Sequence, residues 1–207
     1  MQKLLAISAA FILWSTSAFS MLFDSALELD VKVFGAMPFV HNDSPTYFGT
    51  YLIRNVPFDP IYRLKNQLEK NLNRPLIDRQ EAHITVVTPP EYELIKDIVS
   101  INDIHAMIED SLQDSKFEPI CVGRGSAQIT GNLESTYFVV VRADDLLEVR
   151  RQIAALFYSR GGDRSGFDPE VFYPHITVGY TKRDLHMQDG VIKNQSSCIA
   201  DIQMIEH

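Results

Sequence analysis

Apolar and polar residues alternate along the chain with two different periods, and these periods predict the same order of elements twice. An aromatic and β-branched run at 47–56 predicts a strand. Residues 59–74 then repeat apolar positions at helical spacing, with Pro60 where a first helical turn accepts proline. A β-branched run at 82–88, followed by two prolines, predicts a second strand. The first half is therefore predicted to form a strand–helix–strand unit.

The second half repeats this order. A valine-rich run at 136–143 predicts a strand, and 144–162 predicts a helix that begins at an aspartate cap and ends at two glycines. Residues 172–181 then predict another strand. Sequence identity between the two units is weak outside one tetrapeptide, so we interpret them as a duplication of architecture.

The remaining segments fit around these two units. Residues 91–115 predict a helix interrupted near 100–102, residues 117–130 a strand and a turn, and residues 196–207 a final strand. We therefore expect an α+β fold with two lobes. Each lobe is a small antiparallel sheet backed by a helix, and the two sheets face each other across a central cleft.

The shared tetrapeptide is His-Ile-Thr-Val, which occupies 83–86 in the first unit and 175–178 in the second. Alternate side chains of a strand point to opposite faces. His83 and Thr85 therefore share one face, and His175 and Thr177 do the same in the second unit. If the lobes are related by an approximate two-fold axis, both pairs converge on one cleft.

Two histidines and two threonines in one cleft suit chemistry at a phosphodiester. One imidazole can remove a proton from a nucleophile while the other donates a proton to a leaving group, since histidine titrates near neutral pH. The threonine hydroxyls can contact phosphate oxygens. A single histidine on a strand is usually a packing or surface residue, but its repetition after two similar units favours a catalytic role.

Composition narrows the possible partners and cofactors. The 207 residues include 27 acidic and 19 basic side chains, a formal net charge of −8. This balance argues against duplex DNA as a partner, because duplex binding needs a broad basic face. The four other histidines are scattered without zinc-ligand spacing, so we expect no metal and no other cofactor; they are His41, His105, His186 and His207.

The paired motifs resemble the 2H phosphoesterase superfamily, which includes RNA cyclic phosphodiesterases and proteins similar to 2′-5′ RNA ligases. The stretch "FYPHITVGYTKRDLH" is most similar to the Swiss Army Knife subgroup. The resemblance covers about 47–207 and implies a metal-independent phosphoesterase acting on a nucleotide or RNA end with a cyclic phosphate. Carried over by motif, the acid and base are His83 and His175, and the phosphate contacts are Thr85 and Thr177.

Some assignments stay open at this level. A non-catalytic module that binds a nucleotide or an RNA end is the alternative function. Tyr173 could stack on a base or simply pack at the strand edge. Lys182 and Arg183 follow the second motif and could assist an anionic substrate, although loop charges are usually only solvated.

The N-terminus predicts export. Residues 1–20 combine a basic start, a short apolar stretch and small residues before Ser20, as in a cleaved signal peptide, and no segment is long enough for a stable membrane span. Residues 21–207 would then form a single two-lobed domain, which we expect to be a secreted or extracytoplasmic monomer. In an oxidising compartment Cys121 and Cys198 could form a disulfide; two buried thiols are the alternative. Many RNA-processing members of this superfamily act inside cells, so the predicted export signal argues against an intracellular role in RNA repair.

Overall fold

The computed structural model describes residue 23, residues 25–42 and residues 49–206. The predicted signal peptide lies outside these residues. Within the described part of the chain, no helix combines the length and the hydropathy needed to cross a bilayer.

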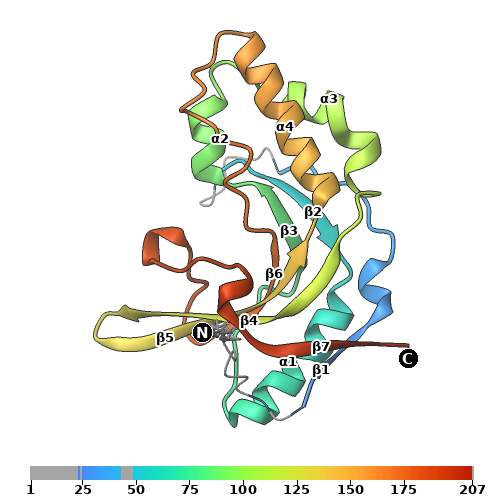
Figure 1. The fold of residues 1–207 in the computed structure, drawn as a ribbon, viewed down its shortest axis with the longest axis vertical. Coiled ribbons are helices and arrows are strands. Elements are labelled where there is room, and N and C mark those ends of the chain that lie inside the picture. The colour runs from blue at the N-terminus through green and yellow to red at the C-terminus, as the bar shows by residue number, and fades with distance from the viewer. Residues whose placement is uncertain (1–22, 24, 43–48, 207) are drawn as a thin grey trace, which may run out of the picture.

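Seven strands form the sheet, in the order β1-β7-β4-β5-β6-β3-β2 (Figure 1). Only the β1–β7 pair is parallel; the other neighbours are antiparallel. The strands are β1 (Leu27–Asp30), β2 (Leu52–Val56), β3 (Ala82–Val87), β4 (Glu118–Ile129), β5 (Asn132–Arg142), β6 (His175–Tyr180) and β7 (Cys198–Ile205). Figure 1 also shows that the tip of the long β4–β5 hairpin extends away from the rest of the sheet.

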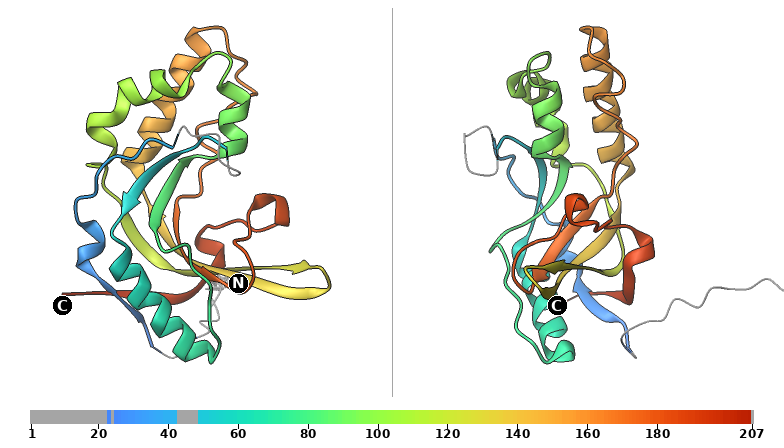
Figure 2. Two further views of the ribbon diagram at one scale, coloured as in Figure 1. Left: turned by 180° about the vertical axis from the view of Figure 1, so that it is seen from behind. Right: turned by 90° about the vertical axis from the view of Figure 1, so that its left-hand side faces the viewer.

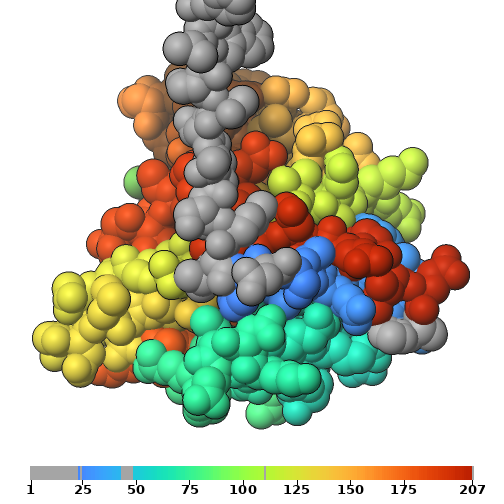
Figure 3. All heavy atoms as spheres, turned by 60° about the horizontal axis from the view of Figure 1, so that its bottom comes forward, coloured from blue at the N-terminus to red at the C-terminus, as the bar shows by residue number. Residues whose placement is uncertain are grey.

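Four α-helices lie at the two ends of the molecule. They are α1 (Phe58–Leu72), α2 (Pro89–Ile95), α3 (Ile101–Leu112) and α4 (Asp144–Ser159). The helices α2, α3 and α4 gather at one end and α1 lies at the other (Figure 2). Figure 3 shows the second end, where α1 lies beside β1. Short 3₁₀ helices occupy Val31–Phe34 (η1), Met187–Asp189 (η2) and Gln195–Ser197 (η3).

The predicted duplication is present as β2–α1–β3 and β5–α4–β6. The α+β class is confirmed, and the strands of the two units join in one continuous sheet. They join where β3 pairs with β6, and the register places Ile84 opposite Ile176. These isoleucines are equivalent residues of the two tetrapeptides. An approximate two-fold axis therefore passes between them.

The face of the sheet that carries these isoleucines is the core face. Ile84 and Ile176 are fully buried in the same cluster as the apolar faces of α1 and α4. In α4, for example, Ile153 and Phe157 recur at helical spacing and are buried. Burial of this face directs the alternate residues, including both histidines, to the other side of the sheet.

The predicted helical segment at 91–115 forms two helices, because a threonine cap begins the first and a serine cap begins the second. Thr88 and Glu91 form a capping box at the start of α2, and Ser100 and Asp103 form another at the start of α3. The second box lies at the predicted interruption near 100–102. It lets the chain change direction between the two helices.

A small second cluster lies on the face opposite the main core. Cys121 and Cys198 form a disulfide with a Cα–Cα distance of 5.8 Å, and this pair packs with Phe138 and Val140. In the β5–β6 register Val140 is opposite His175. The disulfide therefore stabilises the sheet on the histidine side, next to the second tetrapeptide.

Candidate active site

The β3–β6 pairing brings the two His-x-Thr pairs together. Because the strands are antiparallel and Ile84 faces Ile176, His83 neighbours Thr177 and Thr85 neighbours His175 across the strand pair. All four side chains are half-buried and lie on the face opposite the isoleucines. The four residues that the sequence singled out thus form one cluster with approximate two-fold symmetry.

The backbone fixes the tautomer of His175. Its Nδ1 is 2.8 Å from the carbonyl oxygen of Tyr173. A carbonyl can only accept, so Nδ1 carries the proton and the lone pair of the neutral ring is on Nε2. Burial, together with the Lys193 cation, lowers the pKa of His175 to about 3, although the bond to Tyr173 opposes this shift. The site therefore holds His175 as a neutral base.

The environment of His83 is different. Its buried Nδ1 lies 3.5 Å from a carboxylate oxygen of Glu81, a distance at which a protonated ring forms an ion pair. Burial and the Arg79 cation lower the pKa of His83 to about 4, and the charge of Asp184 acts in the opposite direction. The Glu81 carboxylate can stabilise the imidazolium of His83.

Asp184 is the acceptor at the centre of a buried polar network. Its carboxylate accepts hydrogen bonds from Thr177 Oγ1 at 3.1 Å, Thr136 Oγ1 at 2.6 Å and Lys193 Nζ at 2.8 Å. Arg79 adds a longer contact of 3.4 Å. Thr177 therefore donates its hydroxyl proton to Asp184.

The charges of this network favour an anion. Burial opposes ionisation of Asp184, but the Lys193 and His186 charges and the hydrogen bonds hold the pKa of its carboxyl well below the usual range. Lys193 is only 4% exposed, and its Nζ lies 5.4 Å from the centre of the Phe138 ring. Burial lowers the pKa of Lys193, and the Asp184 charge opposes that shift. With Lys193 charged, Lys193 and Arg79 place two positive charges around the Asp184 carboxylate, next to Thr177 of the second motif.

The sequence interpretation missed four members of this network: Arg79, Thr136, Asp184 and Lys193. Only Asp184 gave a usable signal, since it follows Thr177 by seven residues within the quoted motif. A loop carboxylate is usually solvated, and only the folded chain shows that this one is buried.

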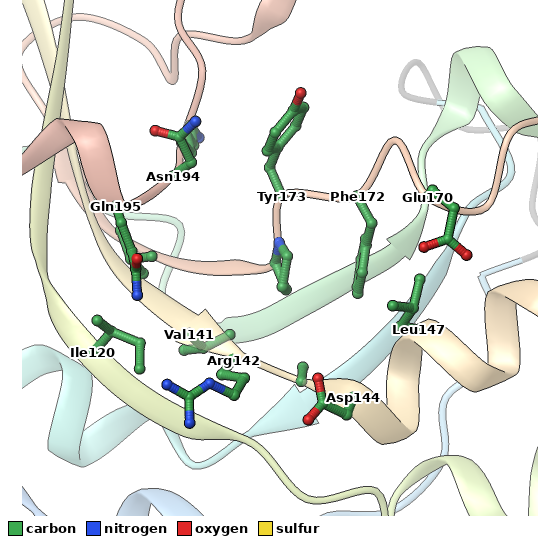
Figure 4. Close-up of a pocket in the computed structure, with 14 residues that line it drawn as sticks. Ile120, Val141, Arg142, Asp144, Leu147, Glu170, Phe172, Tyr173, Asn194 and Gln195 are labelled. Atoms are coloured by element: carbon green, nitrogen blue, oxygen red, sulfur yellow. The ribbon is translucent and has the colours of Figure 1, made fainter.

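The other sequence candidates lie as follows. Lys182 Nζ donates to Thr130 Oγ1 at 3.1 Å, and Arg183 forms an ion pair with Asp189. Both cations are thus engaged outside the histidine cluster. Tyr173 is half-buried, and its ring points away from Val141 (Figure 4).

The remaining titratable side chains that the structure describes lie apart from this cluster or do not form a metal-ligand group. Among the described residues, no group of three His, Cys, Asp or Glu side chains could hold a metal ion. His41 and His105 lie together elsewhere, with their Nδ1 atoms 2.8 Å apart, and contact the ring of Phe39.

A duplicated α+β unit with one His-x-Thr pair on each central strand defines a two-histidine phosphoesterase site. The model of the Swiss Army Knife 2H phosphoesterase domain matches residues 51–186. The chain belongs to this family, and phosphoesterase chemistry follows from that membership. No curated protein and no solved structure matches the chain. The matched segment ends at residue 186, so it does not include Lys193 or Cys198.

Proposed function

We propose that this protein is a metal-independent phosphodiesterase that opens a cyclic phosphate or cleaves a small nucleotide-type phosphodiester. The observation that carries the proposal is the antiparallel pairing of the two tetrapeptides, which places His83 and His175 in one cluster near the Arg79 and Lys193 cations. General acid–base catalysis by two imidazoles accounts for the reaction without a Lewis acid.

The two histidines have different roles. Nε2 of His175 takes a proton from water as the water oxygen forms its bond to phosphorus, because the Tyr173 carbonyl holds the proton on Nδ1. His83 gives its proton to the departing alkoxide as the bond from phosphorus to the leaving oxygen breaks. Glu81 supports the charged form of His83. A bound phosphate anion also raises the pKa of His83 and so favours its protonated form.

The phosphate contacts are less symmetrical than the motifs. Thr85 can donate its hydroxyl proton directly to a phosphate oxygen. Thr177 donates to Asp184, so it reaches a phosphate oxygen only after its hydroxyl rotates. Lys193 and Arg79 supply the charge that stabilises the bound phosphodiester.

The substrate is a nucleotide or an RNA end rather than a long duplex. The net charge of −8 would repel an extended polyanion outside the cleft. We further propose that the chain is exported after cleavage near Ser20 and works as a monomer in an oxidising compartment. The disulfide between Cys121 and Cys198 supports this localisation.

A substrate panel separates the enzyme from a binding module. Purified protein is incubated with 2′,3′-cyclic nucleotides, 2′-5′-linked adenylates and ADP-ribose cyclic phosphate, and products are identified by mass spectrometry. We expect hydrolysis of at least one cyclic phosphate. Tight binding of these compounds without product from any of them would favour the module instead.

A further inference from the structure

A hollow of about 260 Å³ opens beside the second tetrapeptide. Its apolar wall includes Val140, Val141, Leu147 and Phe172, and its polar wall includes Asn194 and Gln195. Figure 4 shows Phe172 and Leu147 at one end and Ile120 and Gln195 at the other. Pockets for whole ligands usually measure about 300–1,000 Å³, so this hollow suits one ring system of a larger ligand.

The hollow adjoins the proposed catalytic cluster. Val140 pairs with His175 in the β5–β6 register, and Pro174 precedes His175 in the chain. Lys193 belongs both to the wall of the hollow and to the network around Asp184. A group attached to a phosphate at the histidines can therefore extend into the hollow.

The cations of the wall do not favour a second anion. Arg142 and Lys193 are its cations, and each already has an anionic partner. Arg142 contacts Glu118 at 2.8 Å, and Lys193 contacts Asp184 at the same distance. A second phosphate would have to displace one of these carboxylates, so the hollow is not built for another anion.

The amides of the wall favour a heteroaromatic ring over an alkyl chain. The side-chain oxygen of Asn194 accepts hydrogen bonds from the Ser196 backbone N–H at 3.0 Å and from Ser196 Oγ at 2.6 Å. This leaves the amide NH₂ to donate to a ligand. An alkyl chain would leave such donors unpaired, whereas the edge of a nucleobase carries acceptors.

We propose that this hollow is the subsite for the nucleobase of the substrate; the inference rests on the proposed function. The apolar wall contacts the faces of the ring, and Asn194 and Gln195 contact its edge. Base recognition by this hollow, rather than by the motif residues, then sets the preference among cyclic nucleotides.

The test compares adenosine 2′,3′-cyclic phosphate with a ribose 2′,3′-cyclic phosphate that lacks a base. Stacking and burial of one base typically contribute 1–3 kcal/mol, so kcat/KM should favour the adenosine compound by about 5- to 150-fold. Leu147→Trp fills the hollow and should bring this ratio close to one. Leu94→Trp, at an exposed position of α2, is the matched control and should keep the ratio.

A second readout does not depend on turnover. Adenosine is titrated into protein with labelled methyl groups, and the Val140 and Val141 signals are followed by NMR. Shifts of these signals that are lost in Leu147→Trp support the subsite, even if no cyclic phosphate is hydrolysed and the proposed function fails. Equal kcat/KM for the two substrates with unchanged methyl signals would overturn the subsite. Preference for a simple alkyl ester would overturn it as well.

Discussion

Mild acid should destabilise the folded chain through the two cleft histidines. Their pKa values are lowered by burial and nearby cations to about 4 for His83 and about 3 for His175. In the unfolded chain both titrate near 6.5. Below pH 6.5 the unfolded state therefore binds protons that the folded state does not, and stability is lost as the pH falls toward the folded pKa values.

The expected loss is large for one domain. Between pH 6.5 and pH 5 the slope for each histidine rises toward about 1.4 kcal/mol per pH unit, which integrates to about 1.6 kcal/mol over this interval. Together they remove about 3 kcal/mol from a total that is typically 5–15 kcal/mol. Most carboxylates titrate below pH 5, so this interval reports mainly on histidine.

Urea denaturation followed by far-UV circular dichroism measures this slope. His83→Gln and His175→Gln should each recover about 1.6 kcal/mol of the loss at pH 5, and the double variant about 3 kcal/mol. His41→Gln changes a histidine outside the cleft and should keep most of the wild-type slope. An unchanged slope in the double variant would refute the conclusion that the fold holds both imidazoles neutral.

Three further predictions concern the rest of the site and the fold. Asp184→Asn leaves the Lys193 charge buried without its partner and should lower the free energy of unfolding in urea by about 3–5 kcal/mol. Adding Lys193→Met should recover part of this loss, and additive losses in the double variant would contradict the coupling of the two residues. The Cys121–Cys198 disulfide closes a loop with a sequence separation of 77, so Cys121→Ser should lower the free energy of unfolding by up to about 4.5 kcal/mol. Mass spectrometry of protein from its native compartment should find no free thiols, and two free thiols would count against the bond. Phosphodiesterase activity should survive excess chelator; loss that zinc or magnesium reverses would contradict the proposed mechanism.

The elements that the sequence predicted well are those set by local pattern. The helical spacing of α1 and α4 and the alternation in β3 and β6 are visible in short windows, so both strand–helix–strand units were predictable. The same alternation predicted that His83 and Thr85 share a face, and likewise His175 and Thr177.

The features that the sequence did not reveal depend on contacts between distant segments. The union of the two units in one sheet follows from the Ile84–Ile176 register, which no local window contains. The unequal surroundings of the two motifs have the same origin. Asp184 and Lys193 are brought to Thr177 by the chain between β6 and β7, so the symmetric motifs gave no sign of this asymmetry.

The most direct test of catalysis by the two histidines is turnover of an accepted cyclic phosphate by His83→Gln and by His175→Gln. One acid or base contributes about 10²–10⁴-fold, so each variant should lose at least about a hundredfold in kcat/KM while remaining folded at pH 7.5. Because the two residues act as a unit, the double variant should be little slower than the slower single variant. His41→Gln should keep wild-type activity. Near wild-type turnover by either cleft variant would contradict paired acid–base catalysis.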